Sequence, residues 1–238
     1  MNTDNKMKVE VWSDIVCPFC YMGKRKFEMA LDQFPYKDKV QVEWKSFLLN
    51  PDAKTDTSIS VYDYLARQKG WSTEKAREIN RQVTEAAAGV GLEYNFDKAV
   101  VANTLRAHAF LQFAKKNGMQ NEAGEKLFKA YFTEGKNVDD IPVLVKIAGE
   151  LGLDTTGLHE ALENGTYMDN VREDLYEAHQ FDIHSVPFFL FDEKIGVIGA
   201  QPAEYFLDVL QKVYNRWKSI TLKATMETAA PRTETAEQ

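Results

Sequence analysis

The chain has 238 residues, of which 44% are apolar and 27% are charged, and its formal net charge at pH 7 is −7. This composition is ordinary for a globular protein, while the acidic balance argues against nucleic acids and anionic membranes as partners. No apolar run approaches the length of a membrane span, and the first ten residues lack the apolar segment of a secretory signal. We therefore expect a cytoplasmic protein.

The first predicted elements meet at the two cysteines of the chain. Residues 9–12 alternate, with Val9 and Val11 set against Glu10 and Trp12, as in a strand. Beyond the cysteines, apolar side chains recur with the spacing of one helical face, at Phe27, Ala30, Leu31 and Phe34. Cys17 of the sequence Cys17-Pro18-Phe19-Cys20 therefore lies where a strand passes into a helix N-terminus. Pro18 fits there because the first-turn N–H groups of a helix have no intrahelical partner.

The middle of the chain changes from strand to helical periodicity. Residues 40–47 alternate again and predict a second strand, parallel to the first. From residue 57 to residue 167 the apolar spacing is helical, without a strand signal. Several of the expected helices begin at side chains that cap an N-terminus, namely Ser72, Asp97, Asp139 or Asp140, and Asp154. These segments predict an all-helical unit.

Strand signals return near the C-terminus. After one more helix, residues 185–191 form a continuous apolar run that is typical of a central strand buried on both faces. Residues 195–199 predict a strand that pairs with it as a hairpin, and Pro202 opens a last helix that continues to Trp217. Beyond it the composition shows no period, which predicts a disordered tail.

The element order is therefore β-α-β, a helical block, and α-β-β-α. This order predicts an α/β protein with a thioredoxin fold that carries a large all-helical insertion. We expect residues 1–56 and 168–218 to form the two parts of the thioredoxin-like domain. The insertion is expected at residues 57–167 and the disordered tail at residues 219–238.

The C-x-x-C pair has the spacing of a redox-active dithiol. A helix N-terminus carries about half a positive charge, and C-x-x-C thiols placed there have lowered pKa values, so that the reactive thiolate forms easily. Cys17 is the expected nucleophile. Cys20, one turn further on, is placed to attack a mixed disulfide and release the partner, and we expect it to be the more buried thiol.

Two other interpretations of the pair are open to the sequence. A structural zinc site needs four ligands, whereas the chain has two cysteines and four histidines without the spacing of a zinc motif. We expect no metal. Two buried, inert cysteines are the second alternative, although a strand-to-helix junction is an exposed place for an inert thiol. A redox dithiol is the favoured interpretation.

Three stretches resemble the DsbA-like branch of the thioredoxin superfamily, and within it the cytosolic FrnE-like dithiol–disulfide oxidoreductases. They are VWSDIVCPFCYMGK, FLLNP and HSVPFFLFDEKIGVIGAQP, at residues 11–24, 47–51 and 184–202. NTLRAHAF and LFKAYFTEGKNV add family character inside the insertion, and the resemblance runs from Met7 to about Trp217. It implies that Val186-Pro187 is a cis peptide packed against the C-x-x-C, with the Val186 backbone turned toward the substrate.

The sequence departs from the family pattern at two positions. Val11 stands where thioredoxin-like folds often carry a buried acid that serves proton transfer at the second cysteine. Water or Asp14 would have to serve instead, although a capping or surface carboxylate is the favoured interpretation of Asp14. The Phe19 side chain offers the thiolate neither a charge nor a ring N–H. We therefore expect a reduction potential below about −120 mV, the value of a strongly oxidising member of the superfamily. In a cytosol whose redox potential is about −250 mV, such a pair is largely reduced and acts as a reductase or isomerase.

The expected partners are protein disulfides or low-molecular-weight thiols. We expect no cofactor besides the redox-active disulfide, with glutathione as a possible co-substrate, and a monomer or homodimer. Residues expected to line the substrate site, beside the catalytic Cys17, Cys20 and Pro187, are Val186, Phe19, Trp12, Asn50, Asn103 and Gln201.

Two different functions remain as alternatives. The first is a glutathione-dependent isomerase or transferase, similar to the kappa-class transferases and 2-hydroxychromene-2-carboxylate isomerases, in which Ser typically replaces Cys17. Polar side chains such as Asn50, Asn103, Arg106 and Gln201 could then line a small-molecule groove. The second is a peptide-binding chaperone module with an aromatic floor. Among the histidines, we expect His108 to be packed in a core and His184 to lie in a loop or on the surface.

Overall fold

The structure, a computed structural model, describes residues 6–229, and the side chains of residues 6–220 within that range. Its centre is a mixed four-stranded sheet in the order β2-β1-β5-β6. β1 (Met7–Ser13) pairs in parallel with β2 (Val40–Ser46) and antiparallel with β5 (Phe188–Phe191). β5 in turn pairs antiparallel with β6 (Ile195–Ile198). The predicted thioredoxin-type sheet and the hairpin that follows Pro187 are therefore confirmed.

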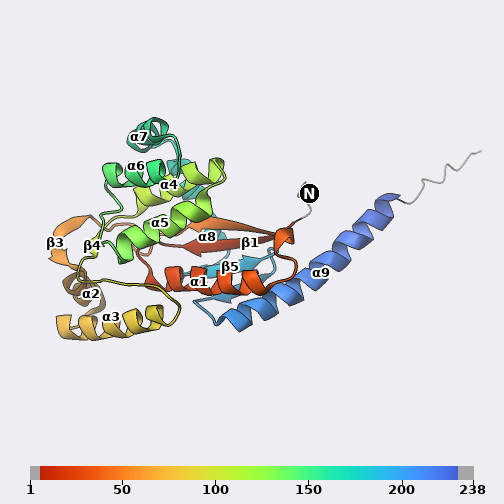
Figure 1. Ribbon diagram of the computed structural model, residues 1–238, viewed down its shortest axis with the longest axis horizontal. Coiled ribbons are helices and arrows are strands. Elements are labelled where there is room, and N and C mark those ends of the chain that lie inside the picture. Colours follow the sequence, from red (N-terminus) through yellow and green to blue (C-terminus); the bar gives the residue numbers. More distant parts are fainter. Residues whose placement is uncertain (1–5, 230–238) are drawn as a thin grey trace, which may run out of the picture.

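One face of the sheet is covered by the first and last helices, α1 (Pro18–Gln33) and α9 (Ala203–Ala229), which lie side by side in Figure 1. The apolar positions of the alternating strands point to this face, and Phe189 and Phe191 of β5 pack there against Phe27 of α1. Leu190, between them, belongs to the core on the other face. β5 is thus buried on both faces, as its continuous apolar run predicts.

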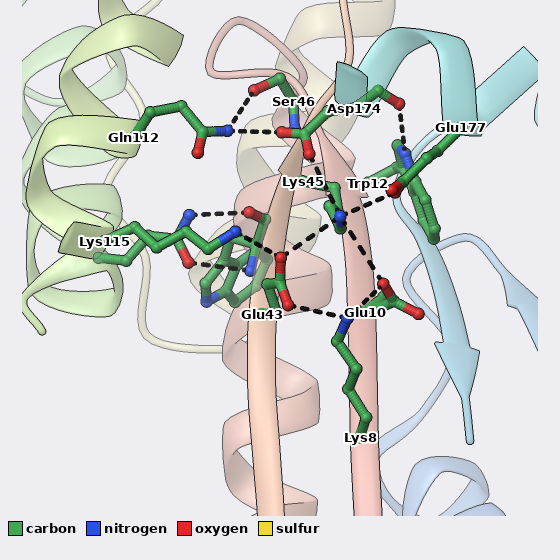
Figure 2. Close-up of polar contacts among 12 residues, drawn as sticks. Lys8, Glu10, Trp12, Glu43, Lys45, Ser46, Gln112, Lys115, Asp174 and Glu177 are labelled. Carbon is green, nitrogen blue, oxygen red and sulfur yellow. Dashed lines mark hydrogen bonds and ion pairs between the residues drawn. The ribbon is translucent and has the colours of Figure 1, made fainter. Parts of the chain in front are cut away.

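The opposite face of β1 and β2 carries charged side chains that are covered by α4 (Leu105–Lys116) and α8 (Met168–Gln180) (Figure 2). Lys45 of β2 bonds Glu177 at 2.7 Å and lies 3.4 Å from Asp174, both on α8. Burial lowers the pKa of Lys45, but the hydrogen bond to Glu177 and the neighbouring carboxylates outweigh it and raise that pKa above its ordinary value. Lys45 is therefore charged and joins the sheet to α8.

The insertion is mostly helical. Besides α4 it contains α2 (Val61–Lys69), α3 (Thr73–Ala88), α5 (Gln120–Phe132), α6 (Ile141–Glu150) and α7 (Thr155–Glu163). Two predicted caps are confirmed, because the Ser72 side chain accepts the Lys75 N–H and the Asp154 side chain accepts those of Thr156 and Gly157. These helices and α4 share one apolar core, which places a second layer against the dithiol end of α1.

Two predictions for the insertion are wrong. It is not entirely helical, because β3 (Asp56–Ser60) and β4 (Val100–Val101) form a two-stranded sheet. Asp97 does not begin a helix either, since the chain passes through β4 and α4 starts only at Leu105. Strands this short contain too few residues to show an alternation, so β-branched Val100 and Val101 were indistinguishable from a helical stripe.

The expected disordered tail from residue 219 is also corrected. α9 continues as a helix to Ala229 and projects beyond the sheet in Figure 1, while residues 230–238 lie outside the described part of the chain. Extending an existing helix needs no new nucleus, and Ala, Lys, Met and Glu favour the helix even without an apolar stripe. Within residues 6–229, no helix is both long enough and apolar enough to span a bilayer.

Candidate active site

The cysteines lie where the sequence predicts them. β1 ends at Ser13, and Cys17 is the N-cap residue of α1 with an extended backbone, followed by Pro18 in the first turn. The Cys17 N–H donates to the carbonyl of Asp14 at 3.0 Å, and the Cys20 N–H donates to the carbonyl of Cys17 at 3.0 Å. This turn fixes Cys17 at the positive end of the helix and Cys20 inside its first turn.

The two thiols differ in burial and in acidity. Both are free, with Cys17 4% exposed and Cys20 completely buried, which confirms the predicted order. Burial raises the pKa of Cys20 well above its ordinary value, and the adjacent Cys17 raises it further. Hydrogen bonds from the Ser13 side chain and the Asp14 backbone oppose this shift. Cys20 is therefore protonated at neutral pH, and the Cys20 proton must leave before this thiol can act.

The loop before β5 closes the site from the opposite side. The Val186-Pro187 peptide bond is cis, as the family resemblance implies, and the thiol of Cys17 lies 3.6 Å from the carbonyl oxygen of Val186. The Pro187 ring packs on α1 at Gly23, where an added Cβ would lie only 2.8 Å from Pro187 Cγ. Gly23 is a site residue that our sequence analysis missed, although a glycine inside a helical pattern signals a close approach.

Aromatic side chains join the helical insertion to the first turns of α1. Tyr21 stacks on Phe128 of α5 with ring centroids 4.9 Å apart, and Tyr94 stacks on Phe132 at 4.4 Å. The Tyr94 hydroxyl donates to the carbonyl of Pro18 at 2.7 Å. Burial first, and then the charge of Cys17, raise the pKa of Tyr94, so it remains a neutral donor. Tyr94 lies in a loop with no motif, and no signal in the sequence identifies it.

The residues predicted to bind substrate do not form one groove. Val186 lies beside Cys17, and Phe19 between the cysteines is 49% exposed and available to a partner. Trp12, in contrast, has no exposed surface, because its ring packs against Phe181 and Phe188. The expectation that Trp12 lines the site is therefore wrong.

The predicted polar side chains are engaged in local structure. Asn50 donates to the Tyr64 hydroxyl at 2.8 Å, and Asn103 donates to the carbonyl of Ala53 at 2.8 Å. Gln201 donates to the carbonyl of Ile198 in the loop between β6 and α9. Arg106 is also held within the insertion, by Asp139. Asn50 and Asn103 hold the loop that follows β2, and Thr55 of this loop joins Asn103 to the Asp139 carboxylate that Arg106 contacts. Gln201 holds a different loop, and the structure brings none of the four to the thiols by a hydrogen bond.

Asp14 is a buried carboxylate, which corrects its interpretation as a capping or surface group. Its side chain accepts the Leu49 N–H at 2.8 Å and lies 3.4 Å from Nε2 of His108. His108 is buried, as predicted, whereas His184 is exposed and pairs with Asp182. Within the described residues, no group of three His, Cys, Asp or Glu side chains has the arrangement of a metal site.

Comparison with known proteins agrees with this geometry. Residues 8–211 match the family model of the DSBA-like thioredoxin domain. The chain is 34% identical over 201 residues to the uncharacterized protein YwbO of Bacillus subtilis, covering 83% of this chain and 92% of that protein. It is 36% identical to a solved structure, a probable DsbA oxidoreductase from Streptomyces coelicolor, with a TM-score of 0.82 and coverage of 88% and 90% of the two chains.

Two more distant structures share the fold. A 2-hydroxychromene-2-carboxylate isomerase is 14% identical with a TM-score of 0.63, over 94% of this chain and 100% of that chain. The cytosolic disulfide reductase DsbM from Pseudomonas aeruginosa is 15% identical with a TM-score of 0.55, over 93% and 100%. At these identities the likeness extends to the fold alone, so the function must be argued from the dithiol itself.

Proposed function

The chain belongs to the family of DSBA-like thioredoxin domains, and from this premise we propose that Cys17 and Cys20 reduce or isomerise the disulfides of protein or small-thiol partners. The membership and the C-x-x-C pair make the chain a thiol–disulfide oxidoreductase. One observation supports the proposed reduction or isomerisation of disulfides most directly. Cys17 lies at the N-terminus of α1 facing the Val186 carbonyl, with the fully buried thiol of Cys20 directly behind it.

The reaction runs in two exchanges. The Cys17 thiolate attacks one sulfur of the partner disulfide, so that a Cys17–partner bond forms and the other partner sulfur leaves as a thiolate that takes up a proton. Cys20 then loses its proton and attacks the Cys17 sulfur. The Cys17–Cys20 disulfide forms, the second partner thiol departs, and two electrons have passed from the protein to the partner.

The direction of electron flow rests on the residues around Cys17. The Phe19 side chain is apolar and the Val186 carbonyl is an acceptor, so neither of these groups donates a hydrogen bond to the thiolate. The reduced form therefore lacks the stabilisation that makes a dithiol strongly oxidising. We expect a potential well below about −150 mV when the pair is equilibrated with glutathione buffers. A value above it would make the protein a net oxidase.

Glutathione is the recycling thiol that we propose, in a cytoplasmic protein that works as a monomer or homodimer without a further cofactor. A DsbM structure that shares the fold was solved with GSH, which supports this choice of thiol. The subgroup that we propose is the FrnE-like one, on the motifs around the cysteines and Pro187.

Turnover of an insulin disulfide with glutathione as reductant tests the activity. We expect Cys17→Ser to abolish it, because no nucleophile remains at the helix N-terminus. Chromene isomerisation that survives in Cys17→Ser would instead support the isomerase alternative. Protection of an aggregating client that is unchanged by Cys17→Ala, without any reduction, would support the chaperone alternative.

A further inference from the structure

The loop that follows β2 is anchored to the segment that precedes Cys17. The Asp14 side chain accepts the N–H of Leu49 at 2.8 Å, while the Asp14 carbonyl accepts the N–H of Cys17 at 3.0 Å. A second bond joins the same two segments, from the Phe47 N–H to the carbonyl of Ser13 at 3.1 Å. Leu49 and the nucleophile are therefore both bonded to one residue, which places Leu49 beside the dithiol site.

The side chain of Leu49 reaches the solvent although its backbone is held. It is 50% exposed, whereas Asp14 is buried. Beyond Leu49 the loop is fixed again, because the Ala53 N–H donates to the carbonyl of Asn50 and the Asn50 side chain donates to the Tyr64 hydroxyl. A backbone that is bonded on both sides of Leu49 keeps this apolar surface at the site, so a partner meets it already in position.

Phe19 provides a second exposed apolar side chain at the same thiol. It stands between the two cysteines, and about half of it is exposed. Neither of the two segments has a charged side chain, because residues 15–23 and 47–51 contain no Asp, Glu, Lys or Arg. These segments therefore offer a partner of Cys17 apolar contacts and no ion pair.

We propose that Leu49 is a specificity-determining residue, and that the preferred partners are disulfides in which an apolar residue adjoins the half-cystine. That neighbour packs on Leu49 and Phe19 while Cys17 attacks the sulfur. The contact removes apolar surface from water on both molecules, which stabilises the transition state of the exchange. Glutathione carries carboxylates and no large apolar side chain, so its reaction with Cys17 gains little from Leu49.

The inference rests on the proposed function, and probes with a coloured leaving group separate the two. The pentapeptides Ala-Leu-Cys-Leu-Ala and Ala-Asn-Cys-Asn-Ala, blocked at both ends, are prepared as mixed disulfides with 2-nitro-5-thiobenzoate, and so is glutathione. The Cys17 thiolate attacks the cysteine sulfur of the probe, the Cys17–probe disulfide forms, and the yellow thiolate leaves. Cys20 then attacks the Cys17 sulfur and releases the probe thiol. The second-order rate constant of yellow thiolate release is measured with the reduced full chain.

For the wild-type protein we expect the leucine peptide to react faster than the asparagine peptide. In Leu49→Gln we expect the ratio of the two rate constants to fall by about three- to tenfold, because the exposed half of a leucine side chain no longer becomes buried. The rate with the glutathione probe is expected to stay at the wild-type level, which shows that the variant is folded and its dithiol intact.

Two outcomes overturn the inference alone. They are equal rates for the two peptides in the wild-type protein, and an unchanged ratio in Leu49→Gln, each with normal release from the glutathione probe. No release from any probe would instead refute Cys17 as the nucleophile, and the inference with it.

Met29→Gln is the matched control, since Met29 is also exposed, at 45%, but lies about three turns beyond Cys17 on α1. We expect the ratio to stay at the wild-type value, and an equal fall in this variant would overturn the proposal. Leu49→Met keeps an apolar side chain of similar size and is expected to retain most of the preference. A fall as large as that in Leu49→Gln would show that apolar contact is not the cause.

Discussion

Gly23 lies in the second turn of α1, where the ring of Pro187 packs directly on its Cα. An alanine there is favoured by helix propensity but places Cβ 2.8 Å from Pro187 Cγ, so the loop that faces Cys17 must move. For Gly23→Ala we expect a loss of about 1–3 kcal/mol of stability and a fall in turnover of about ten- to a hundredfold. Urea unfolding and insulin reduction measure the two effects.

Gly149→Ala in α6 is the matched helical control. Its Cβ would meet only the Thr155 methyl group, at 3.3 Å, and α6 is not part of the dithiol site. We expect turnover to stay at the wild-type level. If Gly23→Ala also left turnover unchanged, the close packing of Pro187 on α1 would not be needed for activity.

At the scale of single residues, the sequence predicts those site residues that lie together in a short motif. Cys17 and Cys20 were predicted from a four-residue motif, and Val186 was predicted from the family resemblance of the segment that contains Pro187. The role of Trp12 was missed because its indole N–H donates to the carbonyl of Asp174, which is 162 residues away. No local pattern in the sequence indicates a partner so far along the chain. The same is true of the hydrogen bond from the Tyr94 hydroxyl to the carbonyl of Pro18.

At the scale of elements, the charged residues between β2 and the helices give the fold a measurable acid sensitivity. Burial raises the pKa of Glu43, but hydrogen bonds from Lys115 and Lys8 and the charge of Lys45 outweigh it and lower that pKa from 4.5 to about 2. A carboxyl group whose pKa is lowered by folding stabilises the folded state above its unfolded pKa. That contribution is lost as pH falls from about 4.5 to about 2.

For Glu43→Gln we therefore expect lower stability than wild type at pH 7 and a difference that shrinks as pH falls through this window. Urea unfolding at a series of pH values measures the difference. Glu193→Gln, in the exposed turn between β5 and β6, is the control and is expected to follow the wild-type curve. A Glu43→Gln difference that stays constant down to pH 2 would contradict the assignment.

Elements with a long apolar period were predicted well, and short or polar ones were not. β5 and the helix caps at Ser72 and Asp154 were predicted from local sequence patterns, and the structure contains all three. β3 and β4 were missed because strands of five and two residues show no period. The end of α9 was misplaced because helix propensity, rather than an apolar stripe, carries it to Ala229.

At the scale of the whole molecule, Lys45 joins the sheet to α8 through carboxylates on both. Glu10 of β1 and Asp174 of α8 are buried beside it, so removal of the ammonium leaves Glu10 paired with Lys8 alone and deprives Asp174 of its neighbouring cation (Figure 2). For Lys45→Met we expect a loss of about 3–5 kcal/mol in the free energy of unfolding. Urea unfolding at neutral pH measures it.

Lys126→Met provides the contrast, because the Lys126–Glu150 pair between α5 and α6 is exposed on both sides. Surface pairs of this kind contribute about 0–1 kcal/mol. Equal losses in the two variants would show that the buried charges do not hold the sheet and α8 together.

The most direct test of the account is to trap the mixed disulfide. Cys20→Ala and Cys17→Ala variants are incubated with a disulfide-bonded peptide, and the adduct is located by intact-mass and peptide-mapping mass spectrometry. We predict a stable peptide adduct on Cys17 in Cys20→Ala and no adduct in Cys17→Ala at the same time point. An adduct on Cys20 that forms as fast in Cys17→Ala would contradict the assignment of nucleophile and resolving thiol.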